Sequence, residues 1–271
     1  MVLKEKVKDF SSFLKLFDLS NNVALVTGGA QGNGLAIAEY LALAGSDVVS
    51  TDIQYTEHKI VLEHNDSKIK KLFMDVSDLD SVKSVVDEIE NKYGKIDILI
   101  NNAGLIYKDR IEDIKLNKWK ELIDVNLTGP TICTKLTVPI MKKNKWGRII
   151  NISSTQAFLH TPKYSAYAAS KAALSHLTKV WASELVSFNI NVNAVCPGYV
   201  MTPMMNKSIL KKQKEENISR EDVIKSFENN VPQERLLNPE EVAFWVLILC
   251  SEASRSVTGI NVSVSGGEVM H

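Results

Sequence analysis

The sequence predicts one doubly wound α/β domain, with a seven-stranded parallel sheet covered by helices on both faces. Short apolar runs rich in Val and Ile alternate along the chain with longer stretches of helical periodicity, which is the pattern of strands joined by crossover helices. No internal repeat, low-complexity tract or Pro/Gly-rich linker divides the 271 residues. At roughly 100–200 residues per domain the length allows one large domain or two small ones, and the unbroken alternation favours one.

The individual elements follow from the spacing of apolar residues. Apolar runs predict seven strands, at Val23–Thr27, Asp47–Thr51, Lys71–Met74, Ile96–Ile100, Arg148–Ile152, Ile190–Val195 and Ile260–Val264. Helical periodicity predicts helices at Leu35–Ala44, Leu79–Tyr93, Trp119–Lys143, Ser165–Ser187 and Pro239–Cys250. Because helices connect most of the neighbouring strands, we expect those strands to run parallel.

Two segments depart from this alternation. We expect residues 1–20 to form an amphipathic arm and residues 21–271 to form the main domain. Apolar residues of the arm recur at helical spacing, at Leu3, Val7, Phe10, Leu14 and Phe17, so this stripe is expected to pack on the same domain or on a neighbouring subunit. Residues 199–236 hold three methionines and a highly charged stretch. We expect a mobile substrate lid there; a surface helical hairpin is the alternative.

The composition argues against several classes of partner and location. Lys and Arg together number 32, as do Asp and Glu, so the formal net charge is 0 and gives no reason to expect a nucleic acid or an anionic membrane as partner. The longest apolar run, which includes Ala243–Cys250, is far shorter than the ~20 residues of a membrane-spanning helix. The N-terminus lacks a sustained apolar core, so we expect no signal peptide. Cys133, Cys196 and Cys250 are widely spaced, which favours a reducing cytoplasm and no metal site.

A glycine-rich loop lies between the first predicted strand and the first predicted helix. It reads TGGAQGNG over 27–34, a GxxxGxG pattern. The N–H groups and the positive dipole end of a helix N-terminus attract an anion. Gly28 allows a tight turn, Gly32 lets a phosphate approach the backbone, and Gly34 lets the helix pack close to the strand. The loop therefore predicts binding of a dinucleotide pyrophosphate, which the backbone N–H of Asn33 can also contact.

An acidic residue ends the second predicted strand. Asp52 lies 24 residues after Gly28, where a carboxylate accepts hydrogen bonds from the adenine-side ribose hydroxyls and repels a 2′-phosphate. No Lys or Arg follows it in Ile53-Gln54-Tyr55, and the glycine loop holds Gln31 rather than a basic residue. These features favour NAD(H) over NADP(H).

Four polar residues are candidates for proton chemistry. Tyr167 and Lys171 are four residues apart, so both side chains rise from one face of a helix. A phenol has a pKa near ~10 and needs a neighbouring positive charge to exchange protons at neutral pH. Ser154 follows the strand RIINI and can hydrogen-bond a substrate oxygen. Asn126 falls inside a predicted helix, where Asn is mildly unfavourable, so we expect a functional polar role for it.

Taken together, these motifs resemble the short-chain dehydrogenase/reductase family, from about Phe17 to Met270. The family pattern TGxxxGxG matches 27–34, its NNAG matches 101–104, and its YxxxK matches 167–171. Tyr167 follows Ser154 by 13 positions, as in the family. One departure is Asn33, where the family usually has an aliphatic residue. The resemblance implies a Rossmann fold and oxidoreduction of alcohols and ketones.

The resemblance also implies roles for individual residues. Ser154 would orient the alcohol or carbonyl and Tyr167 would transfer the proton. Lys171 would bind the nicotinamide ribose and lower the pKa of the tyrosine, and Asn126 would hold a water that links Lys171 to solvent. The implied NAD (NADH) contacts are Gly28, Gln31, Gly32, Asn33, Gly34, Asp52, Ile53, Asp75, Val76, Asn102, Ala103, Gly104, Tyr167, Lys171, Pro197, Gly198, Val200 and Thr202.

The substrate is less narrowly defined. The expected substrate contacts are Ser154, Gln156, His160, Tyr167 and Tyr199. The region around Ser154 and the ending SGGEVM are similar to gluconate 5-dehydrogenases and polyol dehydrogenases, so we expect a small-molecule alcohol or ketone such as a sugar acid, sugar or polyol. Hydroxysteroid, hydroxybutyrate and 3-oxoacyl substrates remain alternatives, as does a non-catalytic NAD(H) sensor. Lys108 and Arg110 could serve an acidic substrate, although exposed basic residues are usually solvated. The resemblance further implies a homotetramer or homodimer.

Overall fold

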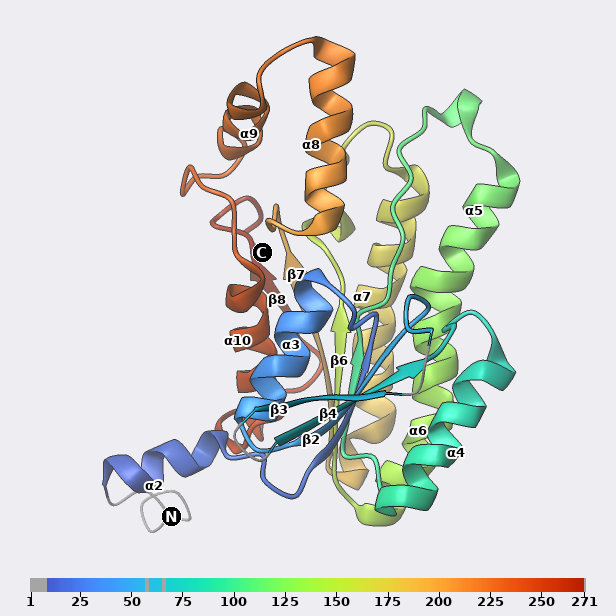
Figure 1. Ribbon diagram of the computed structural model, residues 1–271, viewed down its shortest axis with the longest axis vertical. Helices are drawn as coiled ribbons and strands as arrows, with labels where there is room; N and C mark the ends of the chain where they lie inside the picture. Colours follow the sequence, from blue (N-terminus) through green and yellow to red (C-terminus); the bar gives the residue numbers. More distant parts are fainter. Residues whose placement is uncertain (1–8, 57–58, 65–66, 271) are drawn as a thin grey trace.

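The computed structural model describes residues 9–56, 59–64 and 67–270, with side chains described outside residues 57–68. Within that part of the chain one sheet has the strand order β3-β4-β2-β1-β5-β6-β7-β8, with helices on both sides (Figure 1). The strands are β1 (Val23–Thr27), β2 (Asp47–Asp52), β3 (Lys59–His64), β4 (Ser67–Phe73), β5 (Ile98–Asn101), β6 (Gly147–Ile152), β7 (Ile190–Pro197) and β8 (Asn261–Val264). The predicted doubly wound α/β fold is confirmed.

Seven of these strands are parallel, as predicted, and the eighth is an addition. All neighbouring pairs from β4 to β8 are parallel, whereas β3 runs antiparallel to β4 at the edge of the sheet. The sequence of β3, KIVLEH, holds only three consecutive apolar residues. An edge strand pairs on one side only and needs no long apolar run, so the apolar pattern did not reveal it.

The helices cover the two faces of the sheet in separate groups. They are α2 (Phe10–Leu14), α3 (Gly32–Leu43), α4 (Leu79–Tyr93), α5 (Leu116–Ile123), α6 (Gly129–Asn144), α7 (Ser165–Leu185), α8 (Pro203–Glu216), α9 (Arg220–Glu228) and α10 (Pro239–Cys250). Ala24 and Val26 of β1 pack with α3 and α10, whereas Val23 and Leu25 pack with α4, α6 and α7. Because side chains alternate along a strand, these two apolar clusters lie on opposite faces of the sheet.

The predicted continuous helix Trp119–Lys143 is wrong, because the structure divides it. A single π-helical turn, Asp124–Thr128, joins α5 to α6, and the N–H of Gly129 donates to the carbonyl of Asp124. Pro130 lies in the first turn of α6, and proline has no N–H to continue the α-helical hydrogen bonding. Such π turns are frequent at functional sites, and this one contains Asn126.

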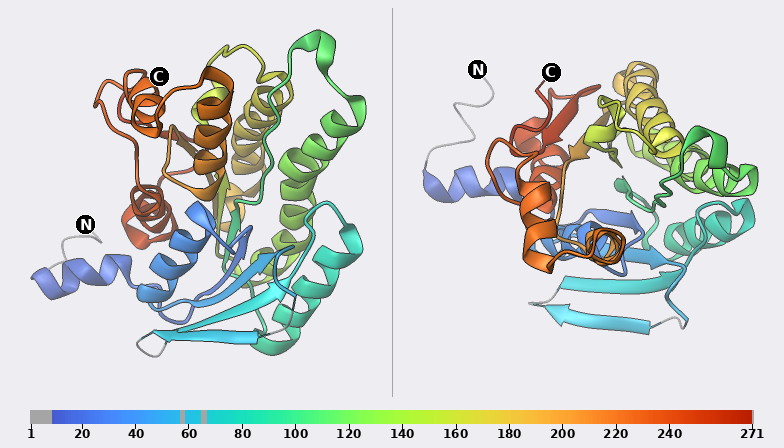
Figure 2. Two further views of the ribbon diagram at one scale, coloured as in Figure 1. Left: turned by 45° about the horizontal axis from the view of Figure 1, so that its top comes forward. Right: turned by 90° about the horizontal axis from the view of Figure 1, so that it is seen from above.

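The N-terminal arm is described only from residue 9 onwards. Asp9 caps the short helix α2, which is followed by a 3-10 turn over Lys15–Phe17. Phe10 is 74% exposed, and α2 projects from the rest of the fold (Figure 2). Leu3 and Val7 of the predicted stripe lie outside the described residues, so the packing of the arm stays a prediction. No helix in the described part of the chain is long and apolar enough to cross a membrane.

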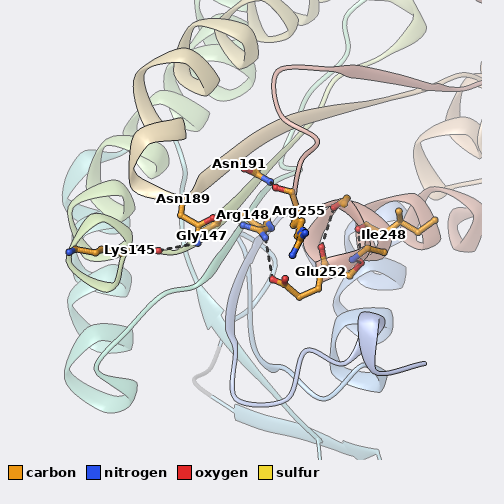
Figure 3. A network of polar contacts seen from close by, with 11 residues as sticks. Lys145, Gly147, Arg148, Asn189, Asn191, Ile248, Glu252 and Arg255 are labelled. Carbon is orange, nitrogen blue, oxygen red and sulfur yellow. Dashed lines mark hydrogen bonds and ion pairs between the residues drawn. The ribbon is translucent and has the colours of Figure 1, made fainter. Parts of the chain in front are cut away.

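A buried arginine connects the sheet to the turn after α10 at the amino end of β6 (Figure 3). Arg148 is 1% exposed, and its Nη2 lies 3.5 Å from Oε1 of Glu252. Its guanidinium also stacks 4.4 Å from the ring centroid of Trp146. Burial lowers the pKa of Arg148. This network lies at the opposite end of the parallel strands from the glycine loop, which follows the carboxyl end of β1.

Candidate active site

The predicted site residues gather at the carboxyl ends of the central strands. The glycine loop follows β1, Asp52 ends β2, and Asn102 follows β5. Ser154 lies shortly after β6, and Gly198 directly follows β7. Since these five strands are neighbours in the sheet and run parallel, their carboxyl ends meet at one edge, which is where α/β sheets bind ligands.

The glycine loop is too tightly packed to accept larger side chains. Gly28 has φ +65°, and a Cβ there would lie 2.7 Å from Cα of Ala103. A Cβ on Gly34 would lie 2.1 Å from the carbonyl oxygen of Gly28. The loop thus brings its bare backbone to the N-terminus of α3, which is the arrangement that accepts a phosphate group. The residues present fit the pyrophosphate of a dinucleotide.

We expect Gly34→Ala to destabilise the protein and to weaken cofactor binding. The added methyl group would collide with the backbone of Gly28, and overpacking of this kind costs about 1–3 kcal/mol. The midpoint of thermal unfolding should fall, and the Kd for NADH, followed by fluorescence, should rise at least tenfold. Gly94→Ala separates stability from binding: its φ of +74° strains an added Cβ, so the midpoint should also fall, but no atom lies within 4 Å of that Cβ and the Kd for NADH should not change. Wild-type values for Gly34→Ala would show that the loop is not tightly constrained.

Asn102 holds the glycine loop against the segment after β5. Its Nδ2 donates to the carbonyl oxygens of Thr27 and Gly28, at 2.9 Å each. In return, Oγ1 of Thr27 accepts from the backbone N–H groups of Asn102 and Ala103, at 3.0 and 3.1 Å. These four hydrogen bonds fix the position of two loops that come from different strands.

Asp52 lies beside the glycine loop, as predicted for a ribose contact. It is 7% exposed, its Oδ2 accepts from the N–H of Ala30 at 3.1 Å, and its Oδ1 accepts from the N–H of Gln54 at 2.9 Å. Ile53, the next residue, is exposed. Just after the neighbouring strand β4, Oδ1 of Asp75 accepts from the N–H and the hydroxyl of Ser77. This corner of the site therefore carries two carboxylates, and neither forms an ion pair with a basic residue whose side chain the structure describes.

The beginning of the segment 199–236, just before α8, packs against the glycine loop. Thr202 caps α8 by accepting from the N–H of Met205, and a Cβ on Gly32 would lie 3.2 Å from Cγ2 of Thr202. In Figure 2, α8 lies over α3 when the molecule is seen from above. The segment forms two helices, α8 and α9, around a small apolar cluster. The helical hairpin of the alternative interpretation is therefore present, and movement as a lid stays a prediction.

Ser154, Tyr167 and Lys171 come together beneath this segment. A hydrogen bond with Ser154 favours the phenolate of Tyr167, but burial outweighs it and raises the pKa of Tyr167 to about 12. Lys171 is 4% exposed; its Nζ donates to the carbonyl of Ile152 at 2.7 Å and lies 5.8 Å from the Tyr167 ring centroid. Burial lowers the pKa of Lys171 to about 8. A proton donor, its hydrogen-bond partner and a cation thus share one buried site.

Asn126 contacts the same group from the π-helical turn. Its Oδ1 accepts from the N–H of Leu105 at 2.7 Å, and its Nδ2 donates to the carbonyl of Leu105 at 2.9 Å and to Ser170 at 3.2 Å. A Cβ on Gly104 would lie 3.4 Å from Oδ1 of Asn126 and 3.7 Å from Nζ of Lys171. Gly104 therefore leaves open the space between the amide and the ammonium group, where the family resemblance expects a water.

The predicted substrate contacts differ from one another in burial and in the residues that they contact. Gln156 is buried and its Oε1 has no hydrogen-bond partner in the described part of the chain. Tyr199 is half-buried, with its ring centroid 5.2 Å from that of Phe227. His160 is exposed. The structure thus places Gln156 beside Ser154, whereas no hydrogen bond or ring contact joins the exposed His160 to Tyr167 among the described residues.

Three residues near Ser154 and Tyr167 were not predicted. The Tyr164 and Tyr167 ring centroids are 6.3 Å apart, and Thr155 is buried. Glu268 lies close enough to both Tyr164 and Tyr199 to raise their pKa values. The signal for Tyr164 and Thr155 was their proximity to the motif residues. Glu268 is distant in sequence and belongs to the SGGEVM ending, whose similarity to polyol dehydrogenases did not single out this residue.

The two basic candidates differ in their environment. Nζ of Lys108 lies 5.0 Å from the Tyr164 ring centroid and 3.4 Å from Oγ of Ser208 on α8, and burial lowers its pKa. Arg110 is exposed and lies 4.0 Å from Glu112. Lys108 therefore connects the segment after β5 to α8, whereas Arg110 belongs to the surface.

Comparison with known proteins agrees with this geometry. Residues 28–268 match the family model described as enoyl-(acyl carrier protein) reductase. The chain is 37% identical over 255 residues to the 3-oxoacyl-(acyl-carrier-protein) reductase FabG of Thermotoga maritima, covering 93% of this chain and 99% of the relative. It is 33% identical over 258 residues to the NAD-dependent glycerol dehydrogenase of Listeria innocua, covering 95% of this chain and 98% of the relative.

A solved structure extends the likeness to three dimensions. The ligand-free aldohexose dehydrogenase (AldT) of Thermoplasma acidophilum has a TM-score of 0.84 and 34% identity, covering 93% of this chain and 95% of that chain. The residues that match the family model, 28–268, include the glycines of the loop, the NNAG segment and the YxxxK pair. The chain belongs to the short-chain dehydrogenase/reductase family of nicotinamide-dependent oxidoreductases.

Proposed function

We propose that this protein is an NAD(H)-dependent oxidoreductase that interconverts a secondary alcohol and a ketone on a small sugar, sugar acid or polyol. One observation carries the proposal: Ser154, Tyr167 and Lys171 meet at the carboxyl edge of the sheet that also bears the glycine loop and Asp52. A non-catalytic NAD(H) sensor would have no need for a buried phenol beside a buried ammonium.

The protein's own side chains carry out the proton transfer. Ser154 donates a hydrogen bond to the substrate oxygen, and Tyr167 gives a proton to that oxygen or accepts one from it. Burial raises the pKa of Tyr167 to about 12, so the phenolate needs additional positive charge nearby. Lys171 holds an ammonium on the same helix face, and Asn126 orients the segment beside it. The bound cofactor supplies the hydride acceptor or donor that no side chain can provide.

The cofactor we propose is NAD(H). The Asp52 carboxylate is buried beside the loop and would repel a 2′-phosphate, and the relative from Listeria innocua carries NAD-dependence in its name. The glycine loop, Asp52, Asp75, the NNAG segment and Thr202 are the residues that we propose to hold the cofactor.

The substrate class rests on the relatives and on the polar residues of the site. Similarity to a glycerol dehydrogenase and to an aldohexose dehydrogenase favours a polyol or sugar. The likeness to a 3-oxoacyl-(acyl-carrier-protein) reductase supports the alternative of an acyl thioester. We further propose a cytoplasmic homotetramer or homodimer with no nucleic-acid or membrane partner. The exposed apolar residues Phe244 and Trp245 on α10 suit a subunit contact.

A substrate and cofactor panel tests the proposal. The protein is incubated with NAD+ and separately with NADP+, together with polyols, aldoses, aldonates, hydroxybutyrate and a hydroxysteroid, and reduced cofactor is followed by absorbance. 3-Oxoacyl thioesters are assayed in reverse, with NADH and with NADPH. We expect the fastest turnover with NAD+ and a polyhydroxylated alcohol. Faster turnover with a 3-oxoacyl thioester and NADPH would contradict the proposed substrate class and cofactor together.

A further inference from the structure

A half-buried carboxylate from the C-terminal segment lies beside Thr155, the residue after Ser154. Glu268 follows β8, and a Cβ on Gly198 would lie 2.6 Å from its Oε2. Its charge raises the pKa values of Tyr164 and Tyr199, adding to the effect of burial. The Tyr164 ring is 6.3 Å from that of Tyr167. The carboxylate is therefore close to two tyrosines that adjoin the catalytic group.

This carboxylate is incompletely paired. Oε2 of Glu268 is buried and has no hydrogen-bond partner in the described part of the chain. Burial raises the pKa of Glu268, and a hydrogen bond with Thr155 is the one contact that opposes this rise; no cation contributes. Leaving a buried acceptor without a donor costs free energy. A ligand that donates a hydrogen bond to Oε2 would remove this desolvation cost.

A second unpaired acceptor lies next to Ser154. Gln156 is 7% exposed and its Oε1 is also buried without a partner in the described residues. Its backbone N–H donates to Oγ of Ser154 at 3.2 Å, which places Gln156 directly beside the residue expected to orient the substrate. It is also the neighbour of Thr155, which contacts Glu268. Gln156 thus adjoins Ser154 and Glu268 adjoins Thr155, and each has one acceptor oxygen without a donor in the described residues.

We propose that Glu268 is a substrate-binding residue that selects neutral polyhydroxylated compounds, such as polyols and sugars, over carboxylates of the same length. The inference rests on the proposed function and narrows its substrate class. Hydroxyl groups can donate to Glu268 and Gln156, and a carboxylate is a strong partner for a hydroxyl donor. An aldonate brings a second negative charge beside an unpaired one, which is repulsive in a buried site.

A cation does lie in the same region, but it does not neutralise Glu268. Lys108 stacks on Tyr164 and contacts Ser208 on α8. The charges that act on Lys108 are those of Lys211 and Glu215, both on α8. The competing possibility is an anionic substrate held by Lys108. A comparison of glucitol with gluconate distinguishes that possibility from a neutral substrate held by Glu268.

The test compares Glu268→Gln with the wild-type protein on a matched pair of probes, glucitol and gluconate, with saturating NAD+. The amide keeps the size of the side chain, removes its charge and can donate to a carboxylate. We expect the ratio of kcat/KM for glucitol to that for gluconate to fall at least tenfold. Glu240→Gln, an exposed glutamate on α10, is the matched control and should leave this ratio unchanged. An unchanged ratio in Glu268→Gln would overturn the inference.

Binding provides a readout that does not depend on turnover. Thermal unfolding of the NAD+-loaded proteins is followed with each probe, and NAD+ alone checks that each variant is folded. We expect glucitol to raise the Tm of wild type more than gluconate does, and expect this order to weaken or reverse in Glu268→Gln. That result without any cofactor reduction would support the inference and refute the proposed reaction. No stabilisation by glucitol, or greater stabilisation of wild type by gluconate, would overturn the inference while leaving the reaction open to other alcohols.

Discussion

Tyr167→Phe should lower kcat by roughly 10²- to 10⁴-fold, the range that general acid–base catalysis typically contributes. Phenylalanine keeps the ring and its packing against Tyr164 but removes the only group that we assign to proton transfer. The substitution removes the hydroxyl and its hydrogen bond with Ser154 and leaves the buried ring in place. The fold should therefore stay intact. The measurement is steady-state oxidation of the best alcohol in the panel, with NADH absorbance as the signal.

The control for this prediction is Tyr93→Phe. Tyr93 ends α4, where Lys92 stacks on its ring at 4.9 Å, far from the carboxyl edge of the sheet. This variant should keep wild-type kcat. Tyr167→Phe should bind NADH with an affinity close to that of wild type, because the glycine loop and Asp52 are unchanged, and this separates a loss of chemistry from a loss of cofactor binding. A Tyr167→Phe protein with wild-type kcat would assign the proton transfer to another group and would refute the mechanism.

Asp52→Asn should shift the cofactor preference, with the ratio of kcat/KM for NAD+ to that for NADP+ falling about 100-fold. Hydrogen bonds to a charged group contribute about 1.5–3 kcal/mol, so loss of the carboxylate should weaken NAD+ binding by roughly 10- to 150-fold. Removing the negative charge also removes the repulsion of a 2′-phosphate. The amide oxygen can still accept from the N–H of Ala30, which Asp52 holds at 3.1 Å, so the glycine loop should keep its conformation.

The matched control is Asp47→Asn, at the other end of the same strand. It changes the net charge by the same amount but lies away from the glycine loop, so the cofactor ratio should not move. Both variants are assayed with saturating alcohol while each cofactor is varied. An unchanged ratio in Asp52→Asn would show that the carboxylate does not discriminate between the cofactors, and would remove the main argument for NAD(H).

The elements that could be predicted from sequence are those with a strong local pattern. The bounds of α4 and α10 match the predicted Leu79–Tyr93 and Pro239–Cys250. Each begins after a capping residue, Asp78 or Asn238, and caps are local signals. The glycine loop was also recognisable, because its spacing reflects a steric requirement that the structure shows directly at Gly28 and Gly34.

The features that the sequence did not predict were missed for physical reasons as well. The π turn around Asn126 is defined by i→i+5 hydrogen bonds, which the spacing of apolar residues does not record, so the pattern predicted one continuous helix over Trp119–Lys143. The edge strand β3 obtains its stability by pairing with β4, which a short run of apolar residues does not reveal. Glu268 lies in the SGGEVM ending, but the role that we propose for it depends on residues that lie 69 or more positions away in the chain, such as Tyr199.

The sequence by itself determined the fold class, the family and the order of the functional motifs, because these depend on residue type and spacing along the chain. Only the tertiary structure decided which groups share a site and how they are charged. Burial sets the pKa values of Tyr167 and Lys171, and chain segments from β1 to β8 must pack together before Glu268 can face Tyr164. Desolvation and long-range contacts arise only when the chain is folded, so no local pattern records them.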